Sequence, residues 1–223
     1  AAYELAAAGI AIRRLRTKAA RSALARAKYE AQVAGISALM AEVEGVAQLM
    51  TQPAARVIAG GTERFLTLEE VAELLASDAF IVDACRNVVR HRGTVVPLAT
   101  RPVLFSLARG LAEGWPGDIS RDVLVKRAFR ARHADESHRA RLRVEIGRLR
   151  AELGTLAEVV ATDQGFALSP RSAHEVVVLA PNAEEQHATV LALLADGEAW
   201  SSSALAIALD ISARGVQRAL EQL

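Results

Sequence analysis

The sequence predicts an α+β fold that is mainly α-helical and carries small antiparallel β elements. Hydrophobic residues make up 52 % of the 223 residues and aromatic residues only 4 %, and alanine and leucine dominate, a composition that favours helices over sheets. Apolar side chains recur at helical spacing along most of the chain, whereas short β-branched runs occur within residues 80–98 and 158–179. A chain of this length holds more than one core, and we divide it after residues 64 and 170.

Residues 1–64 are expected to form a helical N-terminal region and a linker. Apolar residues follow helical spacing in two segments, which predicts two helices up to about residue 50, and Pro53 with Gly60-Gly61 marks the linker. The helices are candidates for dimerisation or for contact with another partner. The first helix also carries six basic residues, interpreted as a solvated face in preference to a phosphate-binding one: Arg13, Arg14, Arg16, Lys18, Arg21 and Arg26.

Residues 65–170 are expected to form the next domain, which begins with a short helix and three strands. Thr67 followed by Glu69-Glu70 is typical of a helix start, because carboxylates in the first turn favour the helix dipole. The β-branched runs at 80–82, 87–90 and 94–98 predict an antiparallel meander, with a hairpin turn at Arg92-Gly93.

Three helices and a hairpin follow, which is the order of a winged helix-turn-helix. Pro102 suits the first turn of one helix, Ser120 caps the next, and Asp135 caps a third that runs to about Leu153. Residues 158–162 and 166–168 flank a turn that contains Gly165, so they predict a β-hairpin.

The third helix is predicted to present a narrow surface to DNA. On a helical wheel Leu142, Ile146, Leu149 and Leu153 form the core stripe, and a face of small residues lies opposite. Small residues let a helix approach base edges in the major groove, and arginines beside them reach phosphates or guanine. The segment 126–150 holds nine Lys or Arg against three acids. The predicted DNA-contacting residues of this domain are Arg139, Ala140, Arg141, Arg143, Val144, Gly147, Arg148, Arg150 and, in the hairpin turn, Gln164.

Four segments of this domain resemble the OmpR/PhoB type of winged-helix DNA-binding domain. VVPLATRPVLF (residues 95–105) is similar to the strand that leads into the family's first helix, and DISRDVL (118–124) to the start of its second. RVEIGRLRAEL (143–153) resembles the recognition helix, and VATDQGFAL (160–168) resembles the wing. The resemblance implies DNA binding. The phosphoacceptor domain usual in that family has no counterpart in the helical residues 1–79, so phosphorelay control is not implied.

Residues 171–223 are predicted to form a second helix-turn-helix domain whose wing is absent or truncated. A strand at 175–179 precedes helices at 184–195, about 201–209 and 212–223. The last two resemble the general bacterial helix-turn-helix pattern, with Val216 and Leu220 as the anchors of the recognition helix. That resemblance implies DNA contacts from Arg214, Gln217 and Arg218.

The function predicted from the sequence is a sequence-specific DNA-binding transcription regulator with two recognition helices. The alternative is a protein-interaction or scaffold module built on winged-helix folds, with only nonspecific DNA binding. We expect no enzymatic activity, cofactor or metal, because the single cysteine and five scattered histidines have no zinc spacing and Ala59-Gly60-Gly61-Thr62 lacks a phosphate-binding lysine. The expected location is the cytoplasm without membrane contact, and the expected partner is double-stranded DNA. RNA polymerase and a second copy of the chain are further candidates.

Overall fold

The computed structural model describes residues 1–129, 135–182, 190, 193–194, 199–209 and 211–221. The chain divides into two units, one formed by Ala1–Arg56 with Arg64–Ser77 and the other by Val57–Glu63 with Asp78–Leu223. The described part combines helices with a mixed sheet and a small antiparallel sheet, so the expected mixture of α and β structure is confirmed.

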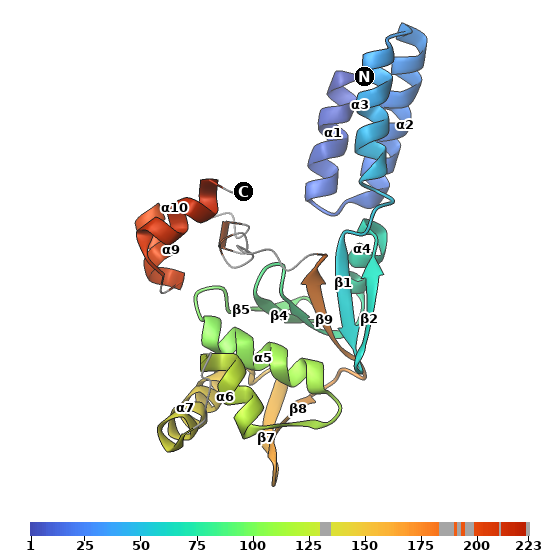
Figure 1. Cartoon of the computed structure of the whole chain (residues 1–223). Coiled ribbons are helices and arrows are strands. Elements are labelled where there is room, and N and C mark those ends of the chain that lie inside the picture. Colours follow the sequence, from blue (N-terminus) through green and yellow to red (C-terminus); the bar gives the residue numbers. More distant parts are fainter. Residues whose placement is uncertain (130–134, 183–189, 191–192, 195–198, 210, 222–223) are drawn as a thin grey trace. The chain divides into compact units, whose positions relative to one another are not determined.

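The N-terminal unit contains three helices, α1 (Ala2–Arg13), α2 (Thr17–Ala34) and α3 (Ser37–Gln48), where the sequence predicted two (Figure 1). The prediction missed a corner at Leu15, whose φ of 53° lies in the left-handed region that leucine adopts at a cost of roughly 1–2 kcal/mol. The core is built mostly from alanines at the contact between α1 and α2, including Ala8, Ala23 and Ala27, because small side chains let two helices approach closely.

The predicted linker contains a hairpin, β1 (Ala55–Ala59) and β2 (Thr62–Leu66). Gly60 and Gly61 both have positive φ, 53° and 77°, the combination that a two-residue hairpin turn requires. The linker interpretation was therefore wrong for these residues. Helix α4 (Leu68–Ala76) then begins as predicted, with a capping box in which the Thr67 N–H donates to Glu70 Oε2 (2.8 Å) and the Glu70 N–H donates to Thr67 Oγ1 (3.4 Å).

The predicted meander is present as β3 (Phe80–Asp83), β4 (Val88–His91) and β5 (Thr94–Pro97), paired antiparallel. Arg92 and Gly93 form the turn with φ of 46° and 80°, as predicted. The sheet is nevertheless mixed, because β9 (Val176–Pro181) pairs parallel with β3. Its strand order is β2-β1-β9-β3-β4-β5. The predicted domain boundary after residue 170 assigned the strand at 175–179 to the C-terminal domain. In the structure this strand is β9, and it is hydrogen-bonded to β3.

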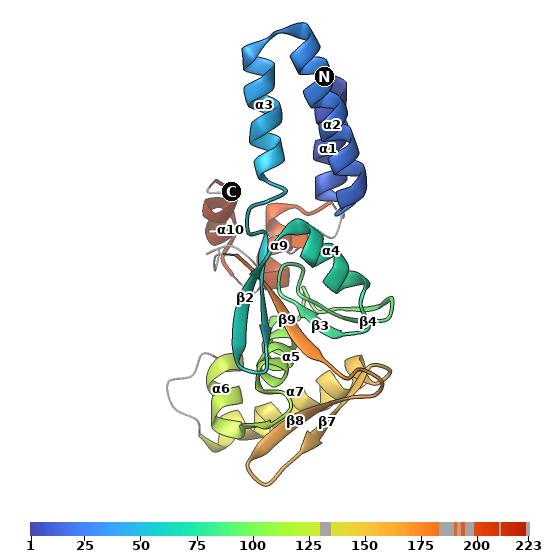
Figure 2. The ribbon, with the colours of Figure 1, turned by 90° about the vertical axis from the view of Figure 1, so that its right-hand side faces the viewer.

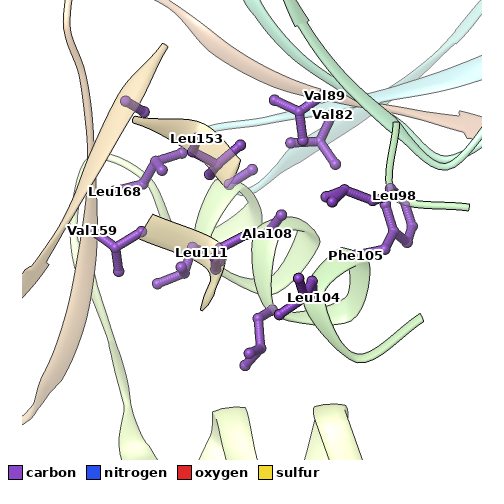
Figure 3. Close-up of a cluster of buried hydrophobic side chains, with 14 of the residues drawn as sticks. Val82, Val89, Leu98, Leu104, Phe105, Ala108, Leu111, Leu153, Val159 and Leu168 are labelled. Atoms are coloured by element: carbon purple, nitrogen blue, oxygen red, sulfur yellow. The ribbon is translucent and has the colours of Figure 1, made fainter. Parts of the chain in front are cut away.

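The part of the chain with the predicted recognition helix contains α5 (Pro102–Gly114), β6 (Asp118–Ser120), α6 (Arg121–Phe129), α7 (Glu136–Leu153), β7 (Ala157–Ala161) and β8 (Gly165–Pro170) (Figure 2). These helices and the hairpin match the prediction, whereas β6, which pairs with β8, was not predicted. One core joins these elements to the larger sheet. Figure 3 shows Val82 and Val89 of that sheet beside Leu98 and Ala108, and Leu153 beside Leu168.

The C-terminal helices are α9 (Ser202–Leu209) and α10 (Ala213–Glu221). Their core contains Leu205, Val216 and Ala219, together with Val190 and Leu193. Most of the helix predicted at 184–195 lies outside the described residues. Leu220, predicted to anchor the last helix, is instead 37 % exposed, and Ala219 packs in the core, because the core-facing residues of α10 are three apart and not four.

Candidate nucleic-acid interface

Helix α7 begins at a well-defined cap. Asp135 is its N-cap residue, and one carboxylate oxygen accepts hydrogen bonds from the His138 N–H (2.9 Å) and from Ser137 Oγ (2.8 Å). These bonds favour the ionised carboxylate and, with the contact to the His138 ring, lower the pKa of Asp135 to about 2. The charged cap therefore fixes the first turn of the helix on which the predicted site lies.

The two faces of α7 lie as predicted. Leu142, Ile146, Leu149 and Leu153 are each at most 1 % exposed and contact α5, α6 and β7 through the shared core. The opposite face is exposed and made of small residues: Ala140, Val144, Gly147 and Ala151. A Cβ atom added at Gly147 would have no neighbour within 4 Å among the residues that the structure describes, so none of these covers the face at this position.

Two arginines on one edge of this face form exposed ion pairs. Arg139 lies 3.3 Å from Asp122 of α6, and Arg143 lies 2.8 Å from Glu136 in the first turn of α7. The Arg139 and Arg143 side chains are 47 % and 65 % exposed. Because ion pairs at this exposure contribute only about 0–1 kcal/mol, both guanidinium groups can exchange their carboxylate for a phosphate at small cost.

The other arginines have more specific local partners. Arg141 lies over the ring of Phe129, with 4.6 Å from its central carbon to the ring centroid. Arg148 pairs at 2.9 Å with Glu145, whose residue is only 8 % exposed. Arg150 Nε donates to the Val159 carbonyl of β7 at 2.7 Å, so this side chain ties the helix to the hairpin. The five arginines predicted on α7 are all exposed, and Arg150 has a structural contact as well.

The hairpin β7–β8 is held against the start of α6 by an arginine that the sequence analysis did not select. Arg121 donates to the carbonyls of Thr162 and Asp163, both at 2.9 Å, and lies over the Phe166 ring. Gln164, predicted to contact DNA, is exposed at the turn between these carbonyls and Gly165. The sequence feature that could have pointed to Arg121 is its position directly after Ser120, the residue predicted to cap α6.

Gly165 allows β6 to pair closely with β8. A Cβ atom there would overlap the backbone carbonyl of Ile119 and lie 2.9 Å from Ser120 Cα. Since the obstacle is backbone, it cannot rotate away. The prediction used Gly165 only as a turn residue, whereas the structure shows that the missing side chain sets the distance between two strands.

The predicted contacts of the C-terminal helices also lie on one exposed surface. Arg214, Gln217 and Arg218 are exposed on α10, opposite the buried Val216 and Ala219. Serine hydroxyls cap both helices, since Ser201 Oγ accepts from the Ala204 N–H and Ser212 Oγ accepts from the Gly215 N–H, each at 3.1 Å.

Among the described residues there is no group of three or more histidine, cysteine or acidic side chains arranged to hold a metal ion. None of the helices described is both long and apolar enough to cross a bilayer. Comparison of the chain with protein-family models, characterised proteins and solved structures finds no match.

Proposed function

We propose that the chain is a sequence-specific DNA-binding transcription regulator in which residues from about 80 to 170 act as a winged helix-turn-helix. Helix α7 is the recognition helix in this proposal, and the β7–β8 hairpin is the wing. The observation that carries the proposal is the exposed face of small residues on α7, edged by arginines whose carboxylate partners are mostly at the surface. Helices α9 and α10 supply a second reader.

The contacts divide into two kinds. Arg139, Arg143 and Arg148 neutralise phosphates, which gives affinity and a strong dependence on salt. Val144 and Gly147 let the helix approach the bases, and the Val144 side chain, 54 % exposed, is placed to meet a thymine methyl. Gln164 reaches the backbone or the minor groove from the wing. Double-stranded DNA is the partner, the bacterial cytoplasm is the expected location, and no catalytic step is assigned to the chain. RNA polymerase and a second copy of the chain remain candidate partners.

Selection of bound sequences from a random duplex pool tests this function. The proposal predicts an enriched sequence motif. The motif has one conserved half-site if only one of the two helix-turn-helix units contacts bases, and two half-sites if both do. Enrichment of no motif, together with a steep salt dependence on every duplex, would favour the alternative of an interaction module with nonspecific DNA binding.

The assignment to α7 is tested on the selected duplex with Arg143→Ala plus Arg148→Ala. Loss of two phosphate contacts should flatten the plot of log K against log salt by about 1.8. Arg148→Ala leaves Glu145 without its partner, so folding must be checked by circular dichroism. The matched control is Arg64→Ala plus Arg92→Ala, which removes the same charge from exposed pairs with Glu70 and Asp78. Equal slopes for the folded α7 variant and wild type would remove α7 from the interface.

A further inference from the structure

A second strongly basic surface lies in the N-terminal unit. Residues 5–29 contain seven lysines or arginines and no aspartate or glutamate, although the whole chain has a formal net charge of only +1. Two of the seven have carboxylate partners, since Arg21 pairs with Glu69 and Arg26 lies 2.8 Å from Glu4. The positive charge that has no carboxylate partner among the described residues is therefore concentrated where α1 ends and α2 begins.

Four of these cations surround the turn between the two helices: Arg13, Arg14, Arg16 and Lys18. We call them the α1–α2 corner. All four are exposed, and within the described residues their side chains make no ion pair or hydrogen bond. They lie within six consecutive residues, so four positive charges are carried on a short stretch of chain.

The backbone of the corner is held by hydrogen bonds and by buried alanines. Leu15 at its centre is held in the left-handed region at a φ of 53° by the bond from its N–H to the Ile12 carbonyl (2.9 Å). The Arg16 N–H donates to the Ala11 carbonyl at 2.8 Å. Ala8, Ala11 and Ala20 are buried on either side of the turn. Strained backbone that is fixed by its surroundings is a feature of functional segments, and here it keeps four like charges together.

We propose that the α1–α2 corner binds the phosphate backbone of duplex DNA, independently of base sequence. This proposal rests on the DNA-binding function proposed above and adds a phosphate-binding surface outside both helix-turn-helix units. Duplex DNA is favoured over an anionic membrane because Ile12 and Leu15 are partly buried and only Ile10, 51 % exposed, adds apolar surface beside the corner, which is too little for insertion. Four neighbouring cations that have no carboxylate partner among the described residues match the dense charge of a duplex, which carries one phosphate per about 1.7 Å of axis.

The test uses the full chain and a 25-base-pair duplex of mixed sequence, with anisotropy titrations over a range of salt. The variant is Arg13→Gln, Arg14→Gln, Arg16→Gln and Lys18→Gln together. Two to four lost phosphate contacts should flatten the salt slope by about 1.8–3.6 and weaken binding about fivefold per contact near 0.15 M salt. Arg13→Lys, Arg14→Lys and Arg16→Lys together keep every charge and should keep the slope.

Two further arms separate this proposal from the function proposed above. If the corner binds DNA and α7 does not, the fourfold glutamine variant, here called the corner variant, has a flatter plot of log K against log salt. The Arg143→Ala plus Arg148→Ala variant then keeps the wild-type slope. If α7 alone binds DNA, the corner variant keeps the wild-type slope, and the corner proposal is overturned. Vesicles of phosphatidylserine and phosphatidylcholine provide the last arm: binding to vesicles that the corner variant loses, with its slope on DNA unchanged, also overturns the proposal.

Discussion

Gly147 offers a substitution that should raise stability and lower DNA affinity together. It lies inside α7 on the exposed face, and a Cβ atom there meets nothing within 4 Å. Gly147→Ala should therefore add the full difference in helix propensity, about 0.8–1.0 kcal/mol. For a unit of this size that raises Tm by about 2–4 °C, measurable by calorimetry or by urea unfolding. Gly147→Gln should still gain about 0.5 kcal/mol, because glutamine is also a good helix former.

The same two variants have a different effect on binding. The glutamine side chain would fill the space between the backbone of α7 and the bases. We therefore expect Gly147→Gln to bind the selected duplex at least about tenfold more weakly, which is the loss expected for one bidentate base contact. Gly147→Ala should lose less. Stability is measured by urea unfolding and affinity by anisotropy on the same preparations. A Gly147→Gln variant that is more stable and binds the selected duplex as wild type does would refute the close approach of this face to DNA.

Gly165 provides the contrast for the stability measurement. The same glycine-to-alanine change at Gly165 places a methyl group against the backbone of Ile119 and Ser120. It should destabilise the fold by about 1–3 kcal/mol or more, because the strands must separate. Equal effects at Gly147 and Gly165 would mean that the propensity of glycine, and not the space around each position, decides the outcome.

Three further predictions concern individual polar groups. Arg121→Ala should destabilise the hairpin by about 1–2 kcal/mol through loss of its two carbonyl bonds and should speed amide exchange in residues 162–165, whereas unchanged exchange would contradict this role. Asp83 has a pKa that is raised by burial, and its carboxylate accepts from the N–H groups of Cys85 (3.0 Å) and Arg86 (3.2 Å). Asp83→Ala should therefore lower the free energy of unfolding in urea by about 1–3 kcal/mol, and Asp83→Asn, which keeps an acceptor, should lower it clearly less. Equal losses in the two variants would exclude this turn contact. The pKa of Asp135 is lowered to about 2, so its stabilisation of α7 is complete above about pH 4 and is lost as the pH falls toward 2. Asp135→Asn should remove this part of the acid unfolding transition measured by circular dichroism. An acid transition identical to that of the wild type would contradict the prediction.

The local parts of the fold were predictable because each depends on neighbours in sequence. The capping residues Thr67 and Asp135, the turn at Arg92-Gly93 and the leucine stripe of α7 all act within a few residues, and the structure has them as expected. The hairpin at Gly60-Gly61 had an equally local signal. It was overlooked because β2, with the sequence TERFL, begins with three polar residues and lacks the apolar run that predicts a strand.

The missed features depend on residues that are distant in sequence. The parallel pairing of β9 with β3 joins Val176 to Phe80, and no periodicity within either strand specifies a partner so far away. The strand β6 has three residues and exists because Gly165 permits close pairing with β8. The bond from Arg150 to Val159 likewise required knowledge of how α7 meets the hairpin. The surface of α7 followed from the helical wheel, whereas the contacts that hold its arginines could not be derived from spacing alone.

The most direct test of the account is site-specific crosslinking from the exposed face of α7. A photoreactive amino acid replaces Val144 in one variant and, as a control, the exposed Phe65 of β2 in another. Each variant is irradiated on the selected duplex at a concentration that saturates binding. The account predicts a crosslink from position 144 to a base within the selected motif and none from position 65. A bound duplex that crosslinks from position 65 and never from position 144 would contradict it.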